Sequence, residues 1–228
     1  MKNLHFILTV SVFIGLHANI LSAQSKYHPN HTDENGRKQG AWVYYHPSGN
    51  LKTIENYKDN LLDGIRIILN DRGYLNIEEY YKSGKLHGEQ RIFDGFARLM
   101  ELKEYHEGVL SGSYKKYNPN TGKLSEEGTY VNNEKHGKYI WYYDNGNPAV
   151  AYTYNMGIID GDAIEYFREG GIASISTYRA NELNGPYKEF YPDGKIKLEG
   201  QYRMGEKVGK WYSFDENGRK TLLKNNKK

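Results

Sequence analysis

Hydrophobic and polar positions recur along this chain with a period close to 24 residues. A glycine marks the period in each unit: Gly40, Gly64, Gly88, Gly112, Gly137, Gly161, Gly185 and Gly209. Successive members lie 24 residues apart, except for one step of 25 that coincides with the longer turn segment from Pro119 to Gly122. A tyrosine falls late in each full unit: Tyr57, Tyr81, Tyr105, Tyr130, Tyr154, Tyr178 and Tyr202. Seven tyrosines in phase indicate a structural repeat.

Two further columns complete the unit. The first carries an aromatic or large apolar side chain throughout: Tyr45, Leu69, Phe93, Tyr117, Tyr142, Tyr166, Phe190 and Phe214. The second lies near the start of each unit and holds Trp42, Tyr114, Tyr139, Tyr187 and Trp211, but Arg66, Gln90 and Ala163 in the remaining units. The second column therefore varies from unit to unit.

The segments between the glycines predict short β-strands, because they are aromatic and β-branched and too short for typical helices. Asn145-Gly146, Asp193-Gly194 and Asn217-Gly218 predict tight type I′ hairpin turns within the units. The segment 83–88 predicts the second turn, which leads to the next hairpin. Because a lone hairpin is not stable in water, we expect the hairpins to stack with the tyrosines as a ladder. The fold class is all-β: an elongated array of consecutive antiparallel β-hairpins with about 15 strands over roughly 70 Å.

The pattern divides the chain into four parts. Residues 1–23 are interpreted as a signal peptide, with an apolar run from Phe6 to Leu16 and a cleavage point after Ala23; an uncleaved anchor is the alternative. Residues 24–39 form a lead-in, and residues 40–223 form the repeat domain of seven full units and a partial eighth. The last unit is expected to end after one strand, Lys210–Phe214, and its turn. Residues 224–228 form a solvated basic tail.

Composition limits the classes of function. The formal net charge of +3 does not indicate a nucleic-acid-binding field. With no cysteine, the chain has no disulfide framework and no residue for a lipoprotein anchor. Together with the signal peptide, this predicts export to the periplasm or the medium.

The units follow G-x-[WY]-x-x-[YF]-x-x-x-G-x-L-x-x-x-x-x-Y-x-x-G-x-x-x-G and resemble MORN-type repeats over about residues 36 to 220. They are similar to the bacterial variant repeats grouped as a YwqK-type antitoxin family. The resemblance implies an elongated sheet of antiparallel hairpins that binds proteins or membrane surfaces and has no catalytic activity of its own. An export signal fits poorly with an antitoxin that meets a cytoplasmic toxin, so toxin neutralisation is an alternative.

Candidate catalytic chemistry is weak throughout. Glu55 and Glu79 occupy equivalent positions in adjacent units, about 9 to 10 Å apart, which is too far for a retaining glycosidase pair and marginal for an inverting one. We interpret them as part of a solvated, charged strand face. His87 and His136 share a column but lie in units that are not neighbours, and no pair has metal-ligand spacing. We therefore predict no catalytic residue, no metal and no cofactor.

The aromatic columns are the candidate binding feature. The tyrosine ladder is expected to pack between hairpins, whereas the variable column could line a groove, which makes Trp42, Tyr139, Tyr187 and Trp211 the candidate binding surface. The leading hypothesis is a non-catalytic exported scaffold whose sheet face binds another protein. An envelope glycan-binding module and antitoxin-like neutralisation are the alternatives, a membrane surface is a further candidate partner, and nucleic acid is not expected.

Overall fold

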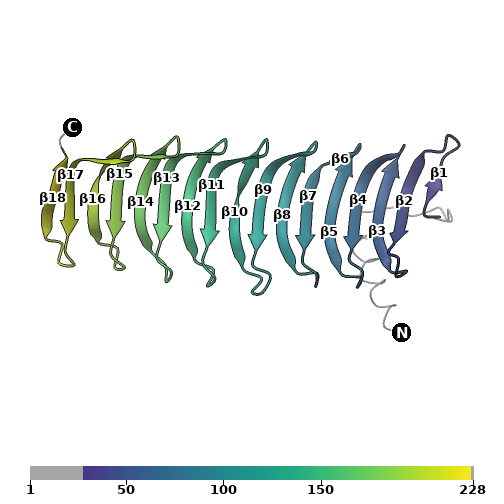
Figure 1. Cartoon of the computed structure of the whole chain (residues 1–228), viewed down its shortest axis with the longest axis horizontal. Coiled ribbons are helices and arrows are strands. Elements are labelled where there is room, and N and C mark those ends of the chain that lie inside the picture. Colours follow the sequence, from purple (N-terminus) through teal and green to yellow (C-terminus); the bar gives the residue numbers. More distant parts are fainter. Residues whose placement is uncertain (1–27, 227–228) are drawn as a thin grey trace, which may run out of the picture.

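The computed structural model describes residues 28–226 as one single-layer antiparallel sheet in which strands lie side by side along the long axis (Figure 1). Its strands are β1 (His31–Thr32), β2 (Lys38–Tyr45), β3 (Leu51–Lys58), β4 (Leu61–Leu69), β5 (Leu75–Lys82), β6 (Lys85–Leu86), β7 (Gly88–Phe93), β8 (Leu99–His106), β9 (Val109–Tyr117), β10 (Leu124–Val131), β11 (Glu134–Tyr142), β12 (Pro148–Asn155), β13 (Ile158–Tyr166), β14 (Ile172–Arg179), β15 (Glu182–Phe190), β16 (Ile196–Arg203), β17 (Glu206–Phe214) and β18 (Lys220–Asn226). The predicted fold class is confirmed. The predicted signal peptide, residues 1–23, lies outside the described residues. Within the described range, no helix has the length and apolarity needed to cross a membrane.

The strands are connected by two kinds of turn, and each kind lies along one long side of the array. Between units, two residues with positive φ connect the strands, as at Asp59 (φ 52°) and Asn60 (φ 68°), which is the backbone of a type I′ turn. Within units, the positive φ falls on one glycine: Gly146 has φ 96°, and its N–H donates to the carbonyl of Tyr143 at 2.9 Å. This is a type I turn followed by a glycine bulge. The type I′ turn predicted at Asn145-Gly146 is therefore wrong, because Asn145 keeps a negative φ and the type I′ turns lie at the opposite side.

The period-marking glycines lie inside strands, except for Gly88, which is the first residue of β7. Gly64 has φ 113° in β4, and the pairing of β3 with β4 shifts register between Glu55 and Tyr57, opposite this glycine. A residue with a positive φ at a register shift is a β-bulge, which bends the strand. The pairing also shifts register opposite Gly112, Gly137, Gly161, Gly185 and Gly209, so the repeat glycine supplies curvature in these units.

One turn carries alanine where the other units carry glycine. Ala97 has φ 61°, at the position occupied by Gly73 (φ 81°) in the preceding unit. A non-glycine residue in this left-handed region costs about 1–2 kcal/mol. We expect Ala97→Gly to raise stability by about 1 kcal/mol, after the greater unfolded-state entropy of glycine is subtracted.

The check is the midpoint of thermal unfolding. Gly73→Ala is the matched control, since no atom lies within 4 Å of its added Cβ and only the backbone conformation changes. It should lose a similar amount. A loss of stability in Ala97→Gly would contradict the strain at this turn.

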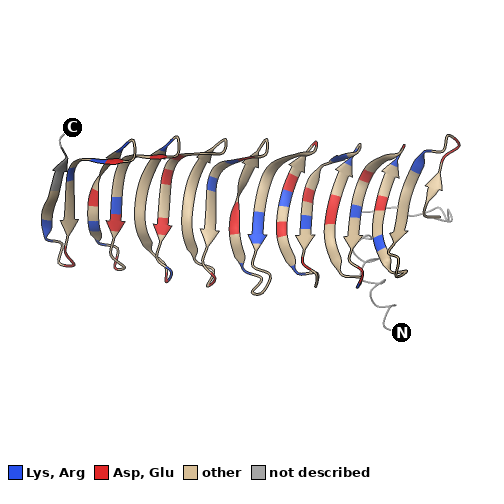
Figure 2. Cartoon of the chain, in the orientation of Figure 1, with Lys and Arg blue, Asp and Glu red and all other residues tan. Residues whose placement is uncertain are grey.

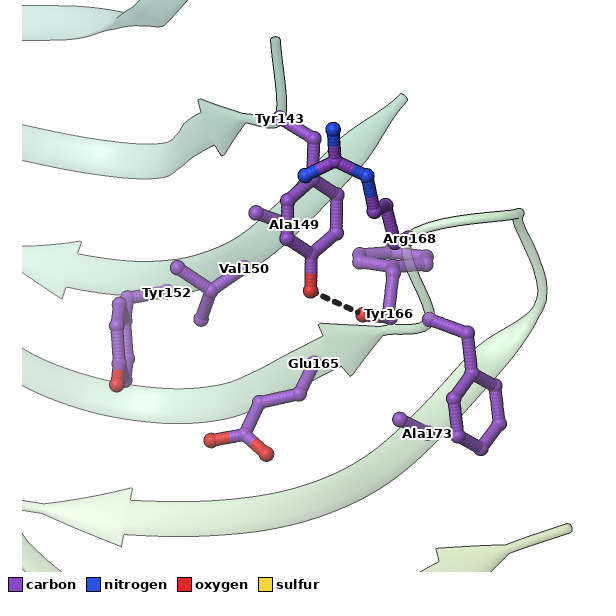
Figure 3. A pocket seen from close by; sticks show the side chains of 9 residues that line it. Tyr143, Ala149, Val150, Tyr152, Glu165, Tyr166, Arg168 and Ala173 are labelled. Atoms are coloured by element: carbon purple, nitrogen blue, oxygen red, sulfur yellow. Dashed lines mark hydrogen bonds between the residues drawn. The ribbon is translucent and has the colours of Figure 1, made fainter. Parts of the chain in front are cut away.

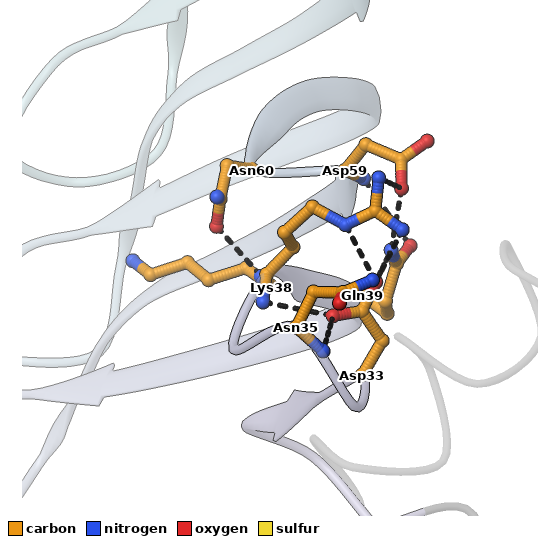
Figure 4. A network of polar contacts seen from close by, with 7 residues as sticks. Asp33, Asn35, Lys38, Gln39, Asp59 and Asn60 are labelled. Carbon is orange, nitrogen blue, oxygen red and sulfur yellow. Dashed lines mark hydrogen bonds and ion pairs between the residues drawn. The ribbon is translucent and has the colours of Figure 1, made fainter.

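The N-terminal end of the sheet is closed by a short hairpin in the predicted lead-in. β1 pairs with β2, and the turn between them is held by Asp33, whose carboxylate accepts hydrogen bonds from the N–H groups of Asn35 and Arg37 at 2.9 Å (Figure 4). The Arg37 side chain bridges Asp33 and Asp59, at 2.7 Å and 3.1 Å. These hydrogen bonds, chiefly from Arg37, lower the pKa of Asp33 to about 2. Part of the lead-in is therefore an ordered cap.

The C-terminal end carries one more strand than the sequence predicts. β18 pairs with β17 from Phe214↔Lys220 to Gly209↔Asn226, so the eighth unit is a complete hairpin. The eighth unit was expected to be partial and the repeat domain to end at residue 223. Backbone pairing instead continues to Asn226, so the domain extends to that residue. The turn at Asp215 forms the same hydrogen bonds as the turn at Asp33, which has the same D-E-N-G-R-K sequence.

Candidate binding surface

One face of the sheet carries the whole tyrosine ladder, and we call it the aromatic face. Next to the ladder, paired residues form a continuous line across the strands, which we call the central row. Its members are Trp42, Glu55, Arg66, Glu79, Gln90, Lys103, Tyr114, Gly128, Tyr139, Tyr152, Ala163, Ser176, Tyr187, Gly200 and Trp211. The variable sequence column supplies every second member, so its variation decides which side chains each part of the face presents.

Aromatic rings in the central row pack on the ladder. Tyr139 is only 1% exposed and meets Tyr130 and Tyr154 edge-on, with ring centroids 6.3 and 6.1 Å apart. Trp211 is 2% exposed and meets Tyr202 edge-on at 5.1 Å. Edge-to-face pairs at these distances stabilise the packing beyond area burial.

Two of the four predicted binding residues, Tyr139 and Trp211, are therefore core side chains in this structure. The other two, Trp42 and Tyr187, are half-buried and also touch the ladder, at Tyr57 and Tyr202. The structure brings only Tyr187 and Trp211 together, with ring centroids 5.7 Å apart, because Trp42 and Tyr139 lie in the first and fifth units. All four rings contact a tyrosine of the ladder.

Toward the N-terminal end the central row is charged. Arg66 lies between Glu55 and Glu79, with nitrogen–oxygen distances of 3.0 and 3.3 Å. The two carboxylates are only 8% and 6% exposed, and the hydroxyls of Tyr57 and Tyr81 donate to them at 2.7 and 3.1 Å. The interpretation of Glu55 and Glu79 as part of a solvated face is wrong, since cross-strand register places both against Arg66.

Buried ladder and row tyrosines make the fold sensitive to alkali. Burial raises the pKa of Tyr139, and it raises that of Tyr187 to about 12. A raised pKa means that the folded state holds the proton more tightly than the unfolded state, where the pKa is about 10. Stability is therefore complete below about pH 10 and falls as pH rises above it, by about 1.4 kcal/mol per pH unit for each such tyrosine.

We expect urea unfolding to show this loss between about pH 10 and 12, with tyrosinate absorbance appearing only as the chain unfolds. Tyr187→Phe should reduce the slope, because it removes one of the titrating groups. Ionisation of these tyrosines near pH 10 in a chain that keeps its β-sheet circular dichroism would contradict the prediction.

The aromatic row is interrupted in the sixth unit, and two hollows open there. Ala163 takes the place of the ring, and its cross-strand neighbour is Ser176. The first hollow, about 490 Å³, is lined by Tyr143, Ala149, Val150, Tyr152, Glu165, Tyr166, Phe167, Arg168 and Ala173 (Figure 3). The second, about 390 Å³, lies beside it and shares Glu165, Phe167 and Ala173. Ala163 lines neither hollow and is only 2% exposed, so the hollows lie beside the central row, nearer the within-unit turns.

Glu165 is a residue of this surface that the sequence did not single out. Two features of the sequence point to Glu165: the small residue Ala163 in the variable column, and a carboxylate two positions later. Alternation along the strand places both on the same face. The environment of the carboxylate also depends on residues of the neighbouring strands, and these cannot be read from the sequence of one unit.

Histidines do not form a metal site in the described residues. His87 and His106 have ring centroids 5.0 Å apart, and His87 lies 3.7 Å from Glu107. However, residues 28–226 contain no group of three or more side chains arranged to hold a metal ion.

Comparison with known proteins agrees with the repeat. A family model described as MORN repeat variant matches residues 38–59, 135–156 and 183–204. These segments begin in β2, β11 and β15 and each contains a strand, a turn and part or all of a second strand. No curated protein matches the chain.

Proposed function

We propose, on the premise that three segments of the chain match the MORN repeat variant, that it is a non-catalytic scaffold that binds another protein through its aromatic face. One observation carries the proposal: no second layer covers this face anywhere in residues 28–226, and it has two adjoining hollows with aromatic walls. Binding sites are typically concave and lined by rings with a few polar groups. A repeat array presents such features at fixed intervals along an extended surface.

Site-specific photo-crosslinking in the native cell tests this proposal. A photo-reactive amino acid at Ala173 lies where the two hollows meet, whereas the same group at Lys188 lies on the opposite face. We expect one protein to be captured from position 173 and not from 188, and the purified partner to bind the purified chain. Capture from 188 alone, or from neither position, would reject the aromatic face.

The location of the scaffold is part of the proposal. We propose that the chain is exported to the periplasm or the medium after removal of residues 1–23, on the basis of the apolar run that precedes Ala23. N-terminal sequencing of the fractionated protein tests this. A start at Gln24 outside the cytoplasm supports export. An intact Met1 in the cytoplasm overturns it and favours antitoxin-like neutralisation, for which a neighbouring toxin gene is the further requirement.

Envelope glycan binding is the second candidate, and exposed rings along one long side of the array favour it. Tyr45, Tyr74 and Phe96 are exposed near the within-unit turns, and the rings of Tyr74 and Phe96 lie 6.2 Å apart. Flat exposed rings can stack on sugars. Calorimetric titration with soluble cell-wall fragments, comparing the wild type with Phe96→Ala, tests this. The absence of heat in both would remove the glycan from consideration.

A further inference from the structure

The carboxylate of Glu165 lies on the wall that the two hollows share. Its recorded partner is the hydroxyl of Ser174, which donates to it at 3.0 Å. Glu165 makes no ion pair with any residue of the described range 28–226. The two cations at the hollows are already engaged: Arg168 pairs with Asp144, and Lys197 pairs with Glu189.

Other carboxylates in the same line of the aromatic face are neutralised. Glu165 belongs to a second row, two residues along each strand from the central row, which also holds Glu101, Glu126 and Glu189. Glu101 pairs with Lys103, Glu126 with Lys116 and Glu189 with Lys197. Among the described residues, Glu165 is the glutamate of this row without a cation, and its unit is also the one with alanine in the central row.

The strands on either side of Glu165 do not supply a counter-charge. β12 contains no charged residue, and β14 contains only Arg179, at its far end; both are almost entirely tan in Figure 2. Residues 137–190 contain seven acidic and four basic side chains, whereas the whole chain has a net charge of +3. This segment of the chain is therefore locally negative, although the chain is positive as a whole.

The walls of the first hollow are aromatic on several sides. Tyr152 and Glu165 lie on one side in Figure 3, and Tyr143 lies across from them, with its hydroxyl donating to the carbonyl of Tyr166 at 2.9 Å. A cation over an aromatic face is attracted by the ring quadrupole, more strongly when it is partly removed from water. The alkyl stem of a lysine or arginine also packs on apolar surface while its charged end reaches a carboxylate.

We propose that the first hollow binds a lysine or arginine side chain of the protein partner, with its cationic end paired to Glu165 and its stem against Tyr143 and Tyr152. This inference rests on the proposed scaffold function and specifies the chemistry of the surface that the scaffold recognises: a basic segment. The unpaired charge of Glu165, the aromatic walls and the uncharged flanking strands coincide at the first hollow, which is why we assign the site there.

Fluorescence anisotropy of a labelled oligo-arginine peptide against the purified full chain tests the site, with an oligo-glutamate peptide of equal length as the negative probe. Glu165→Gln keeps an acceptor for Ser174 but removes the charge, and it should weaken binding of oligo-arginine about tenfold. Glu101→Gln is the matched control, since it removes a charge from the same row at a carboxylate that already has a cation. It should change binding less than twofold.

Ala163→Tyr tests the hollow separately from the charge. It places a ring two residues from Glu165 on the same face, where the equivalent rings of Tyr139 and Trp141 lie 4.6 Å apart, and circular dichroism checks that the sheet is kept. We expect it to weaken oligo-arginine binding although Glu165 is retained. Equal losses in Glu165→Gln and Glu101→Gln would show bulk electrostatics and overturn the proposal, as would an unchanged affinity in Ala163→Tyr.

The cation-site proposal and the scaffold proposal can be rejected independently of each other. If the partner is still captured from position 173 in Glu165→Gln at the wild-type yield, the basic-segment proposal is rejected and the scaffold proposal stands. If oligo-arginine binding depends on Glu165 and Ala163 but no protein is captured from position 173, the cation site stands and the scaffold proposal is rejected.

Discussion

Arg66→Ala is expected to lower the free energy of unfolding by about 3 kcal/mol, because it leaves two buried carboxylates without their shared cation. Glu55 and Glu79 face Arg66 from the two neighbouring strands and are almost inaccessible to water. Removing one member of a buried pair costs more than the pair itself contributes, since the remaining charge is still desolvated. Arg66 is 30% exposed, so the expected loss is at the lower end of the range for buried pairs.

Chemical denaturation of the single variant measures this loss, and a triple variant supplies the control. Glu55→Gln, Arg66→Met and Glu79→Gln together replace the charges with neutral side chains of similar size, and should recover most of the lost stability. The hydroxyls of Tyr57 and Tyr81 retain acceptors in the two glutamines. A triple variant less stable than Arg66→Ala would show that the cluster does not act through its charge.

Gly200→Ala is expected to cost about 2–3 kcal/mol, although it adds a single methyl group. A Cβ at Gly200 would overlap the ring of Trp211, which lies directly over the glycine and is 2% exposed. Gly128 has the same relation to Tyr139, so close packing of a ring on a glycine occurs twice on the aromatic face. In both cases the backbone conformation is compatible with alanine, and the cost comes from the displaced ring alone.

Gly95→Ala separates this overlap from the general effect of removing a glycine. Gly95 has no positive φ, and no atom lies within 4 Å of its added Cβ. Its substitution should be neutral or slightly stabilising in the same denaturation assay. Combining Gly200→Ala with Trp211→Leu should cost less than the sum of the two single changes, because the smaller side chain removes the overlap. Strict additivity would exclude the ring as the cause.

The period of the sequence was sufficient to predict the hairpin array, because turn glycines and the tyrosine column repeat in every unit. Turn type was not predictable from Asn145-Gly146. The bulged turn uses the same dipeptide as a type I′ turn, while the actual type I′ turns have varied sequences such as Ala180-Asn181. The final strand was missed because its leucines alternate poorly with a lysine-rich tail, and only backbone pairing with β17 identifies it.

The candidate site was less accessible to sequence reasoning than the fold. Burial in a single-layer sheet depends on the neighbouring strands, so Tyr139 and Ala163 are both buried, at 1% and 2% exposed, although one is a large ring and the other a methyl group. Burial of Glu55 could not be predicted for the same reason, since a charged residue in an alternating strand pattern is ordinarily solvated. Cross-strand register, and not the character of the individual residues, decided which positions became core and which became open.

The two described ends of the chain lie at opposite ends of the array, with every strand running across the line that joins them (Figure 1). Tension applied between those ends therefore acts perpendicular to the strands and loads the hydrogen bonds of one ladder at a time, so the hairpins peel apart in succession instead of shearing together. Each released unit of 24 residues can extend to about 80 Å. The sheet therefore unfolds one unit at a time under mechanical load. A partner bound near one unit stays bound until that unit unfolds.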